Sequence, residues 1–227
     1  MFVQTIVCFA NSRKNGHRCV AGKTWSRAGR GEWVRPVSQD RSRALKPSLL
    51  AYQNGIQLAL LDIVDVPLEA ALPEGHQQEN VLASEAFFWS RAGRLNWDNI
   101  GLWLDTPVQL WSLHSQSWGM LNNRVAEGNA VIDSSLQLVA VPRLLLKLMH
   151  SPNQNDPHRH VVVGEFDYHG ASYRLHVTDP QMEAQCRARP ERCMEILQPV
   201  LCVSLGECFL QHCYKLIAGV LFERRFS

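Results

Sequence analysis

The sequence predicts a mainly β protein, because short runs rich in β-branched and aromatic residues recur towards both ends of the chain. Five such runs follow residue 135, at 136–141, 159–168, 171–177, 199–205 and 214–222. Short strands without the regular strand–helix alternation of a parallel sheet are typical of a small closed or partly closed barrel. We therefore expect residues 136–227 to form a domain of their own.

The N-terminal part of the chain contains three further strand candidates, at 2–10, 33–37 and 56–66. A polar, glycine-containing stretch at 11–16 reads as a loop. From residue 67 to about 130 the pattern is mixed, with acidic residues and tryptophans. We interpret this stretch as a packing insertion with one or two helices.

Charge is distributed unevenly along the chain. Residues 1–50 contain ten Lys and Arg against two acidic residues, a net charge of +8, although the whole chain carries only +2. Residues 51–142 contain three basic and ten acidic residues, a net charge of −7. A local field of one sign attracts phosphates, so the first fifty residues predict a surface that faces nucleic acid.

Composition excludes several classes of protein. With 46% apolar and 19% charged residues over 227 positions, the chain is globular rather than disordered. No apolar stretch approaches the roughly 20 residues of a membrane helix, and the N-terminus lacks the basic region of a signal peptide. We expect a cytoplasmic protein with no membrane contact.

The seven cysteines form an odd, irregularly spaced set, which predicts reduced thiols rather than a disulfide framework. Cys208, His212 and Cys213 could ligate zinc, but neighbouring residues on a strand point to opposite faces. We assign no metal site.

Catalytic motifs are incomplete. The sequence Ala-Gly-Lys-Thr at 21–24 resembles the end of a phosphate-binding P-loop, but the glycine required at position 17 is His17. Ser204 lacks the glycine-flanked elbow of a serine hydrolase. We assign neither a catalytic residue nor a cofactor.

Six short motifs lie towards the two ends of the chain. Three lie near the N-terminus, at 10–14 (ANSRK), 18–23 (RCVAGK) and 33–38 (WVRPVS). The others lie in the second half, at 173–180 (ending in VTDP), 204–207 (SLGE) and 214–218 (YKLIA). In this order the six motifs resemble the bacterial dual OB-containing domain family, and the resemblance implies two tandem OB-like barrels. From the strand pattern we expect the first barrel at 1–135, with a mixed helical insertion at about 67–130, and the second at 136–227. The resemblance also implies nucleic-acid binding, often beside bacterial defence or genome-conflict systems.

An OB barrel binds a single strand by combining a cationic groove with flat side chains on which bases stack. The first fifty residues offer cations on or beside a glycine-bearing loop and two tryptophans, although core packing is the alternative role of each tryptophan. The predicted nucleic-acid-binding residues are Asn11, Arg13, Lys14, Arg18, Lys23, Trp25, Trp33, Arg35 and Lys215.

The predicted function is therefore binding of single-stranded DNA or RNA, as an accessory component of a defence system. Two alternatives stay open. Polar residues from both ends of the chain, among them Asp179 and Ser204, could converge in a cleft between the barrels that holds a nucleotide or modified base, with or without catalysis. The tryptophan-rich acidic region 67–130 could instead be the docking surface of a protein–protein adaptor.

Overall fold

The computed structural model describes residues 1–113, 115–117, 119–128, 132–151 and 160–223. The chain divides into two compact units, Met1–Leu104 and Asp105–Ser227. No helix in the described ranges is long and apolar enough to cross a membrane.

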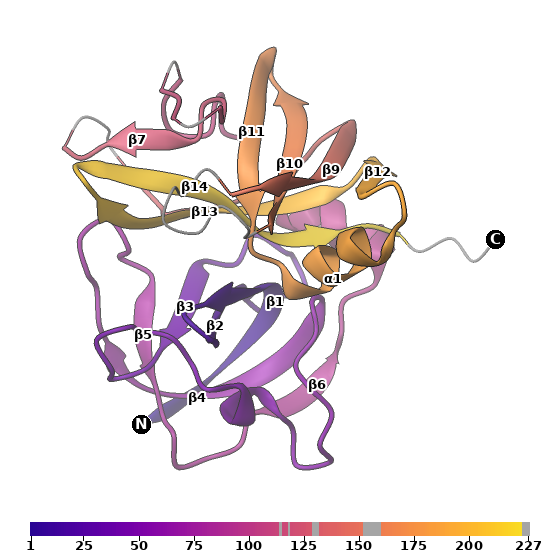
Figure 1. Cartoon of the computed structure of the whole chain (residues 1–227). Helices are drawn as coiled ribbons and strands as arrows, with labels where there is room; N and C mark the ends of the chain where they lie inside the picture. Colours follow the sequence, from indigo (N-terminus) through magenta and orange to yellow (C-terminus); the bar gives the residue numbers. More distant parts are fainter. Residues whose placement is uncertain (114, 118, 129–131, 152–159, 224–227) are drawn as a thin grey trace. The chain divides into compact units, whose positions relative to one another are not determined.

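The first unit is built from strands that Figure 1 draws in indigo to magenta. Its strands are β1 (Phe2–Lys14), β2 (His17–Thr24), β3 (Trp33–Val37), β4 (Asp62–Ala71), β5 (Asn80–Ala83) and β6 (Ser90–Arg94). Two short 3-10 helices, η1 (Pro47–Leu50) and η2 (Trp97–Trp103), lie between strands or follow the last one.

Five of these strands close into a barrel in the order β1-β2-β3-β5-β4, with β4 returning to pair with β1. The pairing of β3 with β5 is parallel and the other four are antiparallel. This closed Greek-key arrangement of five strands is that of an OB barrel. Inward-facing apolar side chains such as Ile6, Val20 and Val64 fill its core.

The second unit repeats this strand order. It contains β7 (Arg124–Ala126), β8 (Leu136–Ala140), β9 (Arg143–His150), β10 (His160–Tyr168), β11 (Ala171–Val177), α1 (Pro180–Ala188), β12 (Cys193–Leu197), β13 (Val200–Phe209) and β14 (His212–Leu221). The strands run in the order β9-β10-β11-β14-β13-β8, and β8 is separated from β9 only by Val141 and Pro142. The β11–β14 pairing is again parallel, so the circuit is that of a second OB barrel.

A helix follows the third strand of the second barrel. Asp179 caps α1, because its Oδ1 accepts hydrogen bonds from the backbone N–H groups of Gln181 and Met182, and Pro180 occupies the first turn. The sequence pattern did not predict this helix of nine residues.

The mainly β fold with two OB-like barrels is confirmed, but the helical insertion is minor. The region 67–130 contains β5, which belongs to the first barrel itself, and η2 as its helical element among the described residues. Its last part belongs to the second compact unit, because the backbone N–H of Asp105 donates to the carbonyl of Leu138 at 2.7 Å and β7 pairs with β14. The units therefore divide at 104/105 rather than at 135/136.

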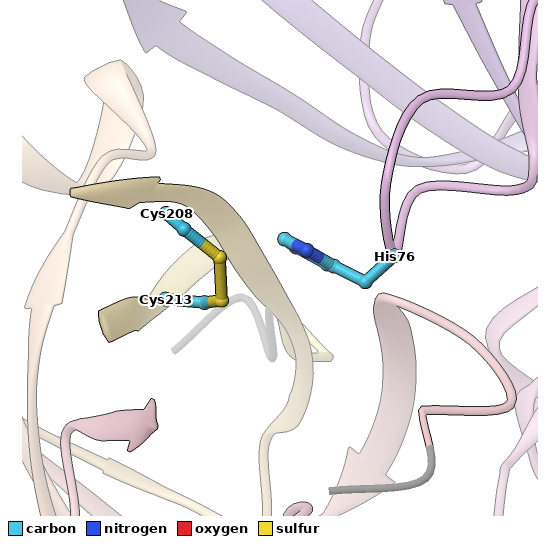
Figure 2. A group of neighbouring side chains, drawn as sticks. All are labelled: His76, Cys208 and Cys213. Carbon is cyan, nitrogen blue, oxygen red and sulfur yellow. A yellow bond between two sulfur atoms is a disulfide. The ribbon is translucent and has the colours of Figure 1, made fainter. Parts of the chain in front are cut away.

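Two local expectations were also wrong. The stretch 11–16 is no open loop, because β1 continues to Lys14 through pairing with β2 and leaves only Asn15 and Gly16 in the turn. Cys208 and Cys213 are not reduced thiols but form a disulfide across the β13–β14 hairpin, which Figure 2 shows. Antiparallel pairing brings these two cysteines directly opposite one another, a proximity that irregular sequence spacing does not reveal.

Candidate nucleic-acid interface

The turn of the β1–β2 hairpin concentrates basic side chains. Arg13 lies opposite Arg18, and Lys14 lies opposite His17. Arg13 and His17 are exposed, and Lys14 and Arg18 are half-buried. Two like charges directly opposite one another in a sheet repel, so Arg13 and Arg18 raise the positive potential of this tip.

A second exposed element follows β2 at Trp25. This side chain is 38% exposed and stacks on Trp103, with ring centroids 5.7 Å apart and planes inclined by 10°. Trp103 is itself buried and packs against Phe9, with centroids 5.8 Å apart. One ring of the pair is therefore fixed in the core and supports the other at the surface.

The loop at 25–32 is held closely against the barrel. The backbone N–H of Trp25 donates to the carbonyl of Thr5 at 2.8 Å, and that of Arg30 donates to the carbonyl of Leu102 at 3.2 Å. Gly29 adopts a φ of 70°, and a side chain there would collide with Leu102. Because the backbone is fixed at both ends, the exposed side chains of Arg27 and Arg30 are presented from a preorganised loop.

Lys23 contacts Trp103, the buried member of this tryptophan pair, and also Trp33. It is buried, and its Nζ donates to the carbonyl oxygen of Trp103 at 2.7 Å while lying 5.0 Å from the ring centroid of Trp33. Trp33 is half-buried and meets Phe9 edge-on. The structure thus places Lys23 inside the barrel wall rather than on its surface.

Two further predicted residues also lie within the first barrel. Arg35 is buried, with Nη2 3.1 Å from the carboxylate of Glu79 and Nη1 3.5 Å from Oδ1 of Asn80. It therefore links β3 to the loop before β5 and to the start of that strand. The side-chain amide of Asn11 donates to the carbonyl oxygen of Leu58 at 2.9 Å. Both contacts hold parts of the barrel together.

Lys215 is the one predicted residue in the second unit. It is 1% exposed, and its Nζ donates to the carbonyl oxygen of Ser112 at 2.5 Å and lies 5.4 Å from the ring of Tyr173. Burial lowers the pKa of this lysine to about 7, because the charged form is disfavoured away from water.

Seven of the nine predicted residues separate into two groups, and the other two, Asn11 and Trp33, are half-buried. Arg13, Lys14, Arg18 and Trp25 reach the surface of the first barrel, whereas Lys23, Arg35 and Lys215 are buried. Sequence reasoning did not single out Arg27, Arg30 and Arg41, which are exposed. The glycines that alternate with basic residues after Trp25 were the available signal, since they indicate a tightly packed basic loop.

The second barrel carries a different surface on β9, β10 and β11. Glu165 lies between Lys147 and Arg174, with both nitrogen–oxygen distances 2.8 Å. Burial raises the pKa of Glu165, but Lys147 and Arg174 outweigh it, and the pKa lies below its ordinary value. A neighbouring hydrogen bond joins Ser172 to Asp167 at 2.6 Å. These charges neutralise one another.

Comparison with known protein families shows to which family the chain belongs. The profile of the dual OB-containing domain matches residues 4–220, which include every strand of both barrels except the ends of β1 and β14. The chain belongs to this family. A search of curated proteins gives no match. The name of the dual OB-containing domain agrees with the two circuits of strand pairing.

Proposed function

We propose that this dual OB-containing domain protein binds single-stranded nucleic acid through its first barrel. The observation that carries the proposal is Trp25, an exposed indole stacked on the buried Trp103 and flanked in its loop by Arg27 and Arg30. A flat ring beside cations is what a sequence-tolerant single-strand site requires, because every base has a face to stack and a phosphate to neutralise.

The electrostatics of the first unit support this proposal. Residues 1–104 contain twelve Lys and Arg against nine acidic residues. Several acids are engaged elsewhere: Glu74 pairs with Arg43, Glu79 with Arg35 and Glu85 with Lys46. Within the described ranges, neither Arg27 nor Arg30 has an ion pair. Their charges are therefore available to a phosphate backbone.

An unpaired strand fits this surface better than a duplex. Stacking on an indole requires a base whose face is uncovered, and base faces in a duplex are covered by their neighbours. Phosphate contacts from the basic hairpin tip and loop would add affinity without reading sequence. We therefore expect weak sequence preference and strong salt dependence.

Fluorescence anisotropy with labelled single strands of about 12 nucleotides tests the proposal. We expect Trp25→Ala to weaken binding roughly 5- to 100-fold, since stacking is worth about 1–3 kcal/mol per base. Phe88→Ala is the matched control, because Phe88 is an exposed aromatic of the same unit, 61% exposed, outside the basic loop. Equal losses in both variants, or no binding by the unmodified protein, would overturn the proposal.

Protein docking through the region 67–130 is the second candidate function. Phe87 and Phe88 support it, because two adjacent aromatic side chains are 50% and 61% exposed. The tryptophans of this region give less support, since Trp89 and Trp103 are buried, Trp97 and Trp111 are half-buried, and Trp118 lies outside the described residues. If the double variant Phe87→Ala/Phe88→Ala keeps full oligonucleotide binding but loses function in cells, docking is favoured.

A place in bacterial defence or genome conflict is a further part of the proposal, and it rests on the family resemblance. Phage plating on cells that carry the intact gene or its Trp25→Ala form tests it. Protection by the intact gene alone would link defence to the strand-binding surface. Equal plating in both strains and in a deletion strain would contradict the role.

A further inference from the structure

The end of the β13–β14 hairpin carries the disulfide of the chain. Cys208 and Cys213 are direct partners across the two strands and are five positions apart in sequence. All seven cysteines lie in the described ranges, and the other five are not disulfide-bonded. The bond is therefore a local staple of one hairpin rather than part of a disulfide scaffold.

The turn inside this staple is conformationally unfavourable. Leu210 and Gln211 have φ values of 50° and 63°, in the left-handed region where Asn and Gly are preferred. Phe209 and Leu210 are also 62% and 69% exposed. The turn thus exposes two apolar side chains to water, and one of them, Leu210, is on a backbone that its residue type disfavours.

Non-covalent contacts also hold the hairpin end: the backbone N–H of Glu127 donates to the carbonyl of Gln211 at 2.9 Å, and Nδ1 of His212 lies 2.9 Å from the carbonyl oxygen of Leu210. The ladder between β13 and β14 is irregular between Leu205 and Cys208, after which only the pairs Cys208–Cys213 and Phe209–His212 remain. A small cluster of Val125, Leu205 and Cys213 lies beneath the end, and β7 pairs alongside it. The disulfide is therefore the strongest link that keeps this turn closed.

We propose that Cys208 and Cys213 form a reversible thiol–disulfide site whose reduction loosens the hairpin end and the exposed Phe209–Leu210 turn. This inference does not depend on nucleic-acid binding. Cys208 is half-buried and Cys213 is 2% exposed, so exchange begins at Cys208. A hairpin disulfide that closes a turn of unfavourable backbone conformation, in a chain of otherwise unbridged cysteines, has the features of an exchangeable bond rather than a structural one.

The reaction partner is a small-molecule thiol and its disulfide. In reduction, two thiol molecules supply two electrons and two protons: the Cys208–Cys213 bond breaks through a mixed disulfide, both cysteines become thiols, and the small molecules leave joined as a disulfide. Oxidation is the reverse, with the small disulfide as oxidant. Atoms and electrons balance without a metal or a cofactor.

Incubation of the full chain in a series of reduced and oxidised glutathione mixtures tests this site. Alkylation followed by peptide mass spectrometry measures the fraction of the pair that is oxidised, and amide hydrogen exchange reports on the hairpin end. We expect one two-electron transition within the series. In the reduced protein, exchange at 209–213 should be roughly 10- to 40-fold faster, the upper value following from the entropy of a closed six-residue loop.

The double variant Cys208→Ser/Cys213→Ser should reproduce the faster exchange at every glutathione ratio. Cys186→Ser is the matched control, because Cys186 is a buried cysteine outside the hairpin and should leave both readouts unchanged. A pair that stays oxidised or stays reduced throughout the series overturns the proposal. So does a transition that leaves hydrogen exchange at the hairpin end unaltered.

Discussion

In the first barrel, β1 and β2 place Arg13 opposite Arg18, whereas in the second barrel β10 and β11 place Glu165 opposite Arg174. The strand order of the two barrels is the same, yet one surface accumulates positive charge and the other neutralises it. Residues 105–227 accordingly contain eleven basic and twelve acidic residues, against twelve and nine in residues 1–104. Two barrels of the same strand order therefore differ in surface charge, because the side chains and not the fold set that charge.

Both barrels also contain a buried lysine, and the two have similar surroundings. Lys23 donates to the carbonyl oxygen of Trp103 and lies over Trp33, while Lys215 donates to the carbonyl oxygen of Ser112 and lies over Tyr173. In each case one ammonium group ties a segment outside the strands to the barrel wall. Basic residues in the family motifs can therefore serve the fold as well as a ligand.

The largest expected effect concerns the ion pair inside the first barrel. Arg35→Ala removes the guanidinium that pairs with the buried carboxylate of Glu79, and breaking a buried pair costs about 3–5 kcal/mol of stability. Arg143→Ala removes an exposed pair with Glu195 in the second barrel and should cost no more than about 1 kcal/mol. Urea unfolding followed separately in each unit measures both. Similar losses of unfolding free energy in the two variants would contradict the prediction that the buried ion pair contributes more than the exposed one.

The stability of the second barrel should depend on pH through the buried Lys215. The pKa of Lys215 is lowered to about 7 by burial, so between that value and its ordinary value of 10.5 the unfolded chain binds more protons than the folded one. Stability therefore rises with pH in this window, by up to about 1.4 kcal/mol per pH unit from this group. Lys215→Met should abolish the rise, which unfolding at several pH values measures. A slope unchanged by the substitution would show that Lys215 is charged when folded.

A smaller effect should follow when the charge balance of the second barrel is disturbed. Glu165→Gln removes the carboxylate that holds Lys147 and Arg174, so two cations become available on that surface. We expect single-strand binding at low salt to strengthen by about 2- to 5-fold, with little change at high salt. Anisotropy titrations at two salt concentrations measure this. Unchanged affinity at low salt would mean that the ion pairs of Glu165 with Lys147 and Arg174 do not limit single-strand binding at this surface.

Much of the fold could be predicted from the sequence, because strand-forming runs and family motifs cover most of the two barrels. The strand at 33–37 matches β3, and the run at 136–141 matches β8. Strand β5 was missed, since its membership of the barrel depends on parallel pairing with β3, a contact between distant residues. Helix α1 was missed because its short polar sequence has no clear helical periodicity.

The candidate site was harder to predict. Charge and residue type identified the basic first fifty residues, but they do not tell an exposed cation from a buried one. Trp25 and Trp33 have the same chemistry, and only packing distinguishes the exposed ring on Trp103 from the half-buried ring against Phe9. Lys23 and Arg35 likewise required their partners to be known.

A matched removal of two cations from each barrel tests the central claim most directly. Arg27→Ala/Arg30→Ala changes the first barrel, and Arg143→Ala/Arg189→Ala removes two exposed arginines and the same net charge from the second. Measured by anisotropy over a salt series, the first variant should lose affinity for single strands and lower the log–log salt slope by about 1.4, since each phosphate contact contributes about 0.7. The second variant should bind like the unmodified protein. Equal losses in the two variants, or a loss confined to the second, would contradict the assignment of binding to the first barrel.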